Sequence, residues 1–295
     1  MSAIERRSVS YSQNFLKSPA LVDQLLNKSD IHITDIVYEI GPGKGIITGR
    51  LAQRCRQVIA IEKDYELAAS LRSRFAGIPN VKIHIGDFLE YRLPNNHYKV
   101  FANIPFNITS AVVTHLISTH IPPDDAYLVM QREAAEKFLG QPRESLYAIL
   151  LKPTFELELL HCFRRSDFVP VPRVDVVMLR LRKRGPPLVA RNDMQLFRDF
   201  VVYVFTMPQP SLRSTLNSIF TPPQLKRLSN DLNLDLARTP TTLSLDQWLS
   251  LFHAFKLLAG PQALSAISGS ERCLRQQQAR LDKVHRTHIS SKGGR

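Results

Sequence analysis

The stretch VYEIGPGKGIITGRLA, residues 37–52, joins an apolar, β-branched run to a helical pattern through a turn with three glycines. The run before the turn is typical of a buried strand, and the residues after it repeat apolar side chains at helical spacing. Gly41, Gly43 and Gly45 let the backbone turn tightly and approach a bound molecule closely. Such a junction predicts a ligand site at the carboxyl end of a strand in an open α/β sheet.

Strand and helix patterns alternate outward from this stretch, up to about residue 184. The predicted strands are Ile36–Gly41, Val58–Glu62, Val81–Asp87, Lys99–Phe106, Ala126–Gln131, Glu156–Phe163 and Val174–Arg182. The predicted helices are one that begins near Pro19, then Gly45–Cys55, Glu66–Phe75, Ser110–Ser118, Arg132–Leu139 and Glu144–Leu151. This alternation implies a mostly parallel sheet with crossover helices. We therefore predict a doubly wound α/β domain with a seven-stranded sheet over residues 1–184.

The basic, proline-containing segment RLRKRGPPLVARND (180–193) marks a domain boundary. Beyond it only helical patterns occur, at Met194–Phe205, Gln224–Asp231 and 244–258, the last with Ser244 and Gln247 spaced as a capping box. Residues 185–260 are therefore predicted to form a small helical domain. Residues 261–295 contain seven Lys or Arg against Glu271 and Asp282, and we predict a flexible basic tail.

The whole chain is strongly basic, with a net charge of +13 over 295 residues and a pI near 9.9. This excess indicates a polyanionic partner, usually nucleic acid. No apolar run is long enough for a membrane-spanning helix, and the first 16 residues lack the apolar core of a signal peptide. The three cysteines form no C-x-x-C pair, so we expect a cytoplasmic protein without metal or disulfides.

Two carboxylates end the strands that follow the glycine turn. Glu62 lies 21 residues after Gly41, where a carboxylate can accept both hydroxyls of a ribose, and Asp87 can accept an adenine amino group. Each acid alone could be a solvated loop residue, but the combination predicts an adenosine pocket. The turn matches neither the G-x-G-x-x-G of dinucleotide enzymes nor a Walker loop, so S-adenosylmethionine is the predicted cofactor.

Seven motifs then occur in a fixed order: SQNFL (12–16), EIGPGKG (39–45), IEKD (61–64), GDFL (86–89), NIPFNIT (103–109), FVPVPRVDVVMLRL (168–181) and LSLDQWLSLF (243–252). Through them the sequence resembles Erm-type adenine-N6 methyltransferases of 23S ribosomal RNA, within the larger group that includes KsgA-type 16S rRNA dimethyltransferases. GKG and LSLDQWLSLF resemble the Erm pattern, whereas EIGPG and MQRE (130–133) resemble KsgA. PSLRST (210–215) stands where KsgA-type enzymes show a basic QRRK cluster, which favours Erm.

The resemblance implies a Rossmann-like S-adenosylmethionine-dependent methyltransferase fold, a helical RNA-binding domain, and a monomer that acts on ribosomal RNA. The cofactor contacts that it implies come from Asn14, Leu16, Gly41, Glu62, Asp87 and Asn103, with Gly43 in the same turn. Asn14 and Leu16 follow from the likeness alone. Without it, QNFL before a helix indicates only a hydrophobic staple.

The tetrapeptide Asn103-Ile104-Pro105-Phe106 carries the predicted chemistry. An exocyclic adenine amine is a poor nucleophile because its lone pair is delocalised into the ring. The Asn103 side-chain oxygen and the Ile104 carbonyl, held outward by Pro105, can accept its two hydrogens and favour the pyramidal form. Phe106 can stack on the base. Because the adenine must leave its stack to reach such a pocket, base flipping or a single-stranded target is implied.

For RNA contact the sequence offers one aromatic residue and several cations. Phe168 is expected beside the flipped base by family likeness, although packing beneath the loop is an equal alternative. The cations are Arg164, Arg165, Arg173, and Arg182, Lys183 and Arg184 of the Arg180–Arg184 run. The expected function is N6-methylation of a 23S rRNA adenine near the peptidyl-transferase centre, with macrolide resistance. The alternatives are KsgA-type dimethylation of 16S rRNA, or an inactive nucleic-acid-binding factor on the same fold.

Overall fold

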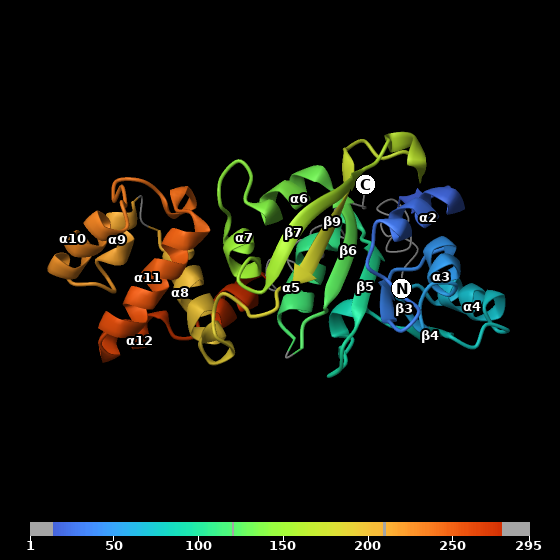
Figure 1. The fold of residues 1–295 in the computed structure, drawn as a ribbon, viewed down its shortest axis with the longest axis horizontal. Helices are drawn as coiled ribbons and strands as arrows, with labels where there is room; N and C mark the ends of the chain where they lie inside the picture. Colours follow the sequence, from blue (N-terminus) through green and yellow to red (C-terminus); the bar gives the residue numbers. More distant parts are fainter. Residues whose placement is uncertain (1–13, 120, 209–210, 279–295) are drawn as a thin grey trace, which may run out of the picture. The chain divides into compact units, whose positions relative to one another are not determined.

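The computed structural model describes residues 14–119, 121–208 and 211–278, and the chain divides into two compact units (Figure 1). One unit comprises residues 1–139 and 155–185, and the other comprises residues 140–154 and 186–295. Residues 140–154 were expected in the first domain. They belong to the second unit because α7 (Leu146–Leu151) buries Ile149 in that unit's apolar core.

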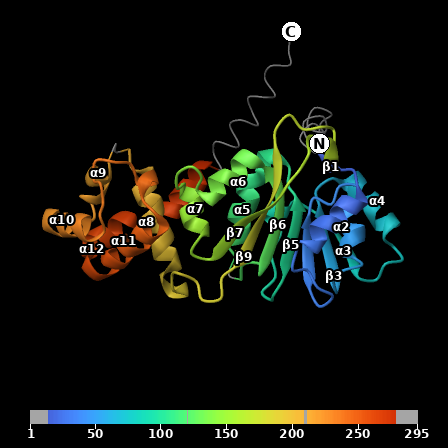
Figure 2. The same cartoon turned by 45° about the horizontal axis from the view of Figure 1, so that its top comes forward.

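The first unit is built on a seven-stranded sheet in the order β4-β3-β2-β5-β6-β9-β7 (Figure 2). Its strands are β2 (Ile36–Ile40), β3 (Gln57–Glu62), β4 (Val81–Ile85), β5 (Lys99–Asn103), β6 (Asp125–Gln131), β7 (Phe155–Cys162) and β9 (Val176–Lys183). Strands β2 to β6 pair in parallel, and β9 is antiparallel to both β6 and β7. The predicted doubly wound α/β fold with seven strands is confirmed.

The helices of this unit lie near their predicted positions. They are α2 (Pro19–Asn27), α3 (Ile46–Leu51), α4 (Tyr65–Arg74), α5 (Thr109–Ile117) and α6 (Arg132–Leu139). Helix α2 begins at its Ser18 cap, which accepts a hydrogen bond from the Leu21 N–H, with proline in the first turn. Helices α2 and α3 bury apolar side chains in one cluster with Phe101 and Tyr127 of the sheet. This packing holds the glycine turn between β2 and α3 at one edge of the sheet.

A second, two-stranded sheet was not predicted. Strand β1 (Phe15–Leu16) pairs antiparallel with β8 (Phe168–Val169), so that Phe15 is opposite Val169 and Leu16 is opposite Phe168. The Lys17 N–H extends this contact by donating to the Asp167 carbonyl at 3.0 Å. Two residues are too short for a periodicity to appear in the sequence. The pairing ties the SQNFL segment to the loop that follows β7.

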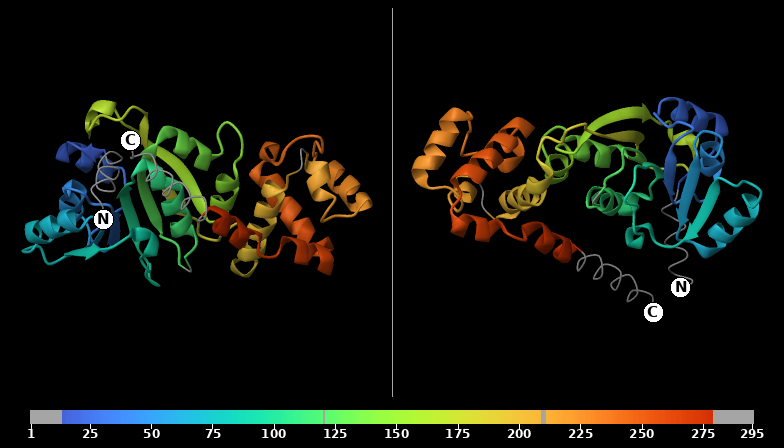
Figure 3. Two further views of the ribbon diagram at one scale, coloured as in Figure 1. Left: turned by 180° about the vertical axis from the view of Figure 1, so that it is seen from behind. Right: turned by 60° about the horizontal axis from the view of Figure 1, so that its bottom comes forward.

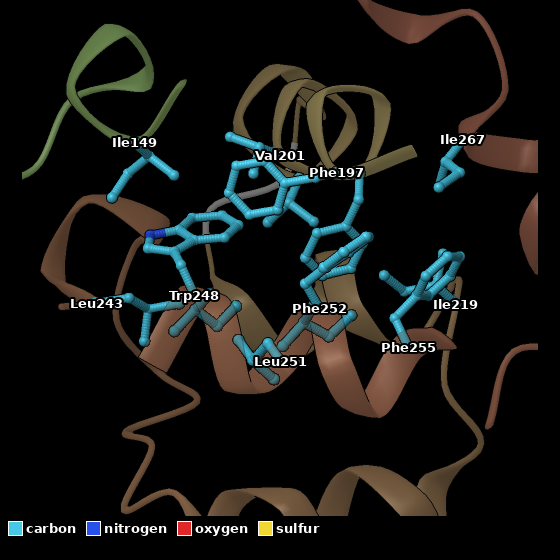
Figure 4. Close-up of a cluster of buried hydrophobic side chains, with 14 of the residues drawn as sticks. Ile149, Phe197, Val201, Ile219, Leu243, Trp248, Leu251, Phe252, Phe255 and Ile267 are labelled. Atoms are coloured by element: carbon cyan, nitrogen blue, oxygen red, sulfur yellow. The ribbon is translucent and has the colours of Figure 1, made fainter. Parts of the chain in front are cut away.

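The second unit is helical, as predicted, and is coloured yellow to red in Figure 3 apart from α7. It contains α7, α8 (Met194–Thr206), α9 (Leu212–Leu216), α10 (Pro222–Asp231), α11 (Leu245–Leu258) and α12 (Pro261–Ile267). Figure 4 shows Trp248 and Phe252 of α11 directed toward Phe197 and Val201 of α8. The predicted capping box is present at the start of α11.

The segment after residue 260 differs from the predicted flexible tail. Helix α12 buries Ile267 fully in the core of the second unit, and residues 270–278 are helical. Asp199 of α8 accepts hydrogen bonds from the Gly269 and Glu271 N–H groups, at 3.2 and 2.9 Å, and so anchors the start of that helix. Residues 279–295 of the predicted tail lie outside the described residues. Across the described ranges, every helix is too short or too polar to cross a bilayer.

Candidate active site

The glycine turn and the end of β3 are joined by one carboxylate. Gly41, Gly43 and Gly45 all have positive φ angles, of 65°, 55° and 75°. The Gly43 N–H donates to Oε2 of Glu62 at 3.0 Å, and the Asp64 N–H donates to Oε1 at 2.9 Å. Burial raises the pKa of Glu62 above its ordinary value. The structure therefore places Glu62 directly beside the turn.

Phe15 closes the turn from the other side. A Cβ atom on Gly43 would lie 2.4 Å from Cε1 of Phe15, which is closer than any real contact. The Lys44 ammonium lies 5.6 Å from the centroid of the same ring. Around Gly41, in contrast, a Cβ would meet nothing within 4 Å. Glycine is therefore required at 43 by both its φ angle and the aromatic ring, while Gly41 faces open space.

Asp87 follows β4, the neighbour of β3. Its Oδ1 atom accepts a hydrogen bond from the Leu89 N–H at 3.0 Å and so caps the short helical turn η1 (Phe88–Glu90). Its Oδ2 atom accepts from the Lys63 ammonium at 2.7 Å. Glu62 and Asp87 thus end adjacent strands at the carboxyl edge of the sheet, as the sequence predicted.

Asn103 ends β5 at the same edge. Its Nδ2 atom donates to the main-chain oxygen of Asn14 at 2.7 Å. Because the nitrogen is engaged there, Oδ1 is the atom left to accept a hydrogen bond from a bound group. The Ile104 N–H donates to the Val129 carbonyl at 3.1 Å, and the Ile104 carbonyl has no hydrogen-bond partner among the described residues. Two acceptors therefore stand next to each other where β5 stops.

A single pocket connects these elements. It is lined by the N-terminal segment, the glycine turn and the end of β5, through Asn14, Phe15, Gly41, Asn103, Ile104, Pro105 and Phe106. Leu16 does not line it. Its side chain is buried in the apolar cluster shared with α2 and α3. The structure therefore brings together the four residues of the Asn-Ile-Pro-Phe motif, Asn14 and the first glycine. Leu16 anchors the N-terminal segment by packing into the apolar core.

Phe168 is not at the pocket wall, where it was expected. It has no exposed surface and packs in the same apolar cluster as Leu16, with its ring centroid 5.2 Å from that of Phe163. Its pairing with Leu16 across the two-stranded sheet explains this position, because both side chains point into the core. The expected contact between Phe168 and RNA therefore has no geometric basis here.

The basic run at the end of β9 is also misplaced for substrate contact. Because β9 is antiparallel to β6, Arg182 lies opposite Asp125, the first residue of β6, at the amino edge of the parallel strands. Arg182 and Arg184 pair with Glu156, and Lys183 pairs with Asp124. Arg182, Lys183 and Arg184 are thus at the opposite edge of the sheet from the pocket.

The other three predicted cations lie at the carboxyl edge of the sheet, which is also the edge that carries the pocket. Arg164 and Arg165 follow β7 and Arg173 precedes β9, and all three are exposed. Arg165 pairs with Asp175 at 2.9 Å, whereas the side chains of Arg164 and Arg173 have no partner among the described residues.

Glu39, the residue before the last in β2, is a buried acid that is not among the predicted site residues. It is 1 % exposed, and neither carboxyl oxygen has a hydrogen-bond partner among the described residues. Burial raises the pKa of Glu39 to about 8, so the carboxyl is mostly protonated at neutral pH. An acid within an otherwise apolar strand was the signal available in the sequence. The described residues contain no cluster of His, Cys, Asp or Glu suited to a metal ion.

A seven-stranded sheet in this order, with one antiparallel strand beside β6 and a glycine turn after β2, defines the S-adenosylmethionine-dependent methyltransferases. The model of the ribosomal RNA adenine dimethylase family matches residues 4–257, and the chain belongs to this family. The protein is therefore an enzyme that transfers a methyl group from S-adenosylmethionine to N6 of adenine in ribosomal RNA.

Similar proteins come from both branches of the family. An rRNA adenine N-6-methyltransferase of Bacillus licheniformis is 29% identical over 243 residues, which cover 82% of this chain and 84% of that protein. A ribosomal RNA small subunit methyltransferase A of Geobacter metallireducens is 31% identical over 84% of this chain and 95% of its own. The structure of the 23S rRNA methyltransferase ErmE matches with a TM-score of 0.73 and 30% identity, over 82% of this chain and 100% of that one.

Proposed function

We propose that the enzyme methylates N6 of an adenine in 23S rRNA near the peptidyl-transferase centre, and so confers resistance to macrolides, lincosamides and streptogramin B. The observation that carries this proposal is the likeness to the 23S enzyme ErmE, which extends over that whole structure at 30% identity. The motifs GKG and LSLDQWLSLF point the same way.

The cofactor pocket is proposed to lie along the edge formed by β2, β3 and β4. Glu62, already fixed by two main-chain N–H groups, would accept the ribose hydroxyls. Asp87 would accept the adenine amino group once the Lys63 ammonium, on a side chain 55% exposed, turns to solvent. Gly41 leaves room for close approach of the ligand, Gly43 holds the turn against the Phe15 ring, and Asn14 lines the pocket next to the buried Leu16. S-adenosylmethionine, when bound, supplies the activated methyl group.

Asn103 and Ile104 are the proposed catalytic acceptors. The Asn103 Oδ1 atom and the Ile104 carbonyl would each accept one hydrogen of the adenine amine, which shifts its lone pair out of the ring. Phe106, half-buried at the pocket wall, would stack on the base, a contact worth about 1–3 kcal/mol. Catalysis of this kind depends on positioning and on fixed acceptors rather than on a strong base. Arg164, Arg165 and Arg173 would bind phosphates at the same edge.

The test is methyl transfer from labelled S-adenosylmethionine to protein-free 23S and 16S rRNA, offered separately, with primer extension to locate the modified adenine. Label in 23S, with one stop in the peptidyl-transferase loop, is the expected result. Label in 16S at adjacent adenines would overturn the 23S target and favour the small-subunit reaction, which the Geobacter relative supports by its 31% identity. Expression in a susceptible host, followed by macrolide sensitivity, tests the resistance role.

A further inference from the structure

The segment formed by strand β8 and the loop that leads to β9 displays apolar side chains. Val169, Val171 and Val174 are 48%, 58% and 37% exposed, three large apolar residues within six positions of the chain. Single exposed apolar side chains are common on proteins, but a group of them marks an interaction surface. The same segment buries Phe168 and Pro172, so it is anchored while the valines face solvent.

The position of this loop is set by the two-stranded sheet. Val169 is the register partner of Phe15, and Phe15 lines the pocket together with Asn103 and Phe106. The Lys17 N–H bond to Asp167 holds the other end of the pairing. The first exposed valine, Val169, therefore lies on the strand next to Phe15, which lines the pocket that is proposed to receive the target adenine.

The charges around the loop suit an RNA partner. Arg164 precedes it and Arg173 lies within it, and neither side chain has a partner among the described residues. Two acids lie nearby: Asp175 pairs with Arg165, and the Asp167 carboxylate accepts from the main-chain N–H of Arg164 at 2.8 Å rather than from a guanidinium. An apolar tip flanked by exposed arginines without an ion-pair partner among the described residues fits a partner with apolar base faces and phosphates close together.

We propose that Val169, Val171 and Val174 form a wedge that enters the rRNA base stack beside the adenine that moves into the pocket. Removing a base from a stack exposes its neighbours to water, and a branched apolar side chain can cover the faces left open. The wedge would thus lower the cost of flipping, while Arg164 and Arg173 hold the flanking phosphates. This inference rests on the proposed pocket, and is independent of whether the target is 23S or 16S rRNA.

The test compares the double variant Val171→Ser, Val174→Ser with wild type. Val169 is left unchanged because it pairs with Phe15. Ile33→Ser is the matched control, since Ile33 is β-branched, 69% exposed and located before β2, at the other edge of the sheet. All three positions are exposed, so equal thermal midpoints are expected. The RNA is a fragment of whichever rRNA wild type methylates, so a 16S target leaves the test intact.

The fragment is used as a folded hairpin and as an open single strand, each with 2-aminopurine next to the target adenine. With the hairpin, the double variant should lose the rise in 2-aminopurine fluorescence and about tenfold in kcat/KM; with the open strand it should stay within about twofold of wild type. Ile33→Ser should match wild type on both. An equal loss on both RNAs, or no loss on either, would overturn the wedge.

Discussion

The side-chain amide of Asn103 donates a 2.7 Å hydrogen bond to the main-chain oxygen of Asn14, a residue 89 positions earlier in the chain. This bond joins the end of β5 to the segment that pairs with β8. It also determines which end of the amide stays available, because the nitrogen is committed and the oxygen is left at the pocket. The N-terminal segment therefore orients the group that we assign to catalysis.

Asn103→Ala should reduce methyl transfer by at least about 100-fold, as expected when one fixed acceptor for the reacting group is removed. S-adenosylmethionine binding should weaken but remain measurable by calorimetry, because Glu62 and Asp87 are untouched. The matched control is Asn107→Ala, which changes an exposed asparagine of the same motif that does not line the pocket. Full activity in Asn103→Ala would contradict the proposed mechanism.

Gly43→Ala should lower cofactor affinity at least tenfold and lower the thermal midpoint, because its Cβ would overlap the Phe15 ring at a positive φ angle. Gly77→Ala is the control, since a Cβ there meets nothing within 4 Å. Adding Phe15→Ala to Gly43→Ala removes the overlap but not the backbone strain, and should restore part of the stability. If Gly43→Ala behaves like Gly77→Ala, the turn is looser than its geometry indicates.

Glu39→Gln should change how stability depends on pH. The pKa of Glu39 is raised to about 8 in the folded protein, so the folded state holds a proton that the unfolded state loses above the ordinary glutamate range. The contribution of Glu39 to the free energy of unfolding should therefore be complete below the ordinary glutamate pKa of 4.5 and fall as pH rises toward 8, by up to about 1.4 kcal/mol per pH unit.

Unfolding of the Glu39→Gln variant releases no proton from this position. The free energy of unfolding of the variant relative to that of wild type should therefore rise between about pH 5 and 8 and then level off. The measurement is urea unfolding of both proteins at several pH values. Parallel curves for the two proteins would show that Glu39 is not held protonated.

Arg164→Ala with Arg173→Ala should weaken rRNA binding and reduce the slope of log K against log salt by about one per lost phosphate contact. Arg182→Ala with Arg184→Ala should leave both quantities near wild type, because these side chains pair with Glu156 at the opposite edge of the sheet. Filter binding at several salt concentrations distinguishes the two pairs. A larger loss of binding from Arg182→Ala with Arg184→Ala would instead support the sequence prediction that the Arg182–Arg184 run contacts RNA.

Truncation after residue 278 should preserve the thermal midpoint and flatten the salt dependence of RNA binding, since it removes five Lys or Arg and one Asp. Truncation after residue 260 should instead destabilise the protein by a few kcal/mol, roughly the cost of losing a fully buried Ile267 and its neighbours. Unfolding and binding curves for both truncations separate these effects. Unchanged RNA binding after truncation at residue 278 would show that residues 279–295 do not contact the substrate.

Much of the site could be predicted from local patterns. Gly41, Gly43, Glu62, Asp87 and Asn103 were placed at strand ends because each follows an apolar run, and parallel strands bring their carboxyl ends to one edge. Tertiary pairing decided the rest. The direction of β9 carries Arg182–Arg184 away from that edge, and the pairing of β1 with β8 buries Phe168 and exposes the valines that follow it.

By itself the sequence determined the alternation of strands and helices, the glycine turn, and the motifs that identify an rRNA adenine-N6 methyltransferase. These features depend on the order of side chains within short segments, where periodicity and turn preferences act directly. Only the tertiary structure decided which end of the Asn103 amide stays available, which cations lie at the same edge of the sheet, and that residues 140–154 join the second unit. Each depends on contacts between segments far apart in the chain, whose partners and directions no local pattern contains.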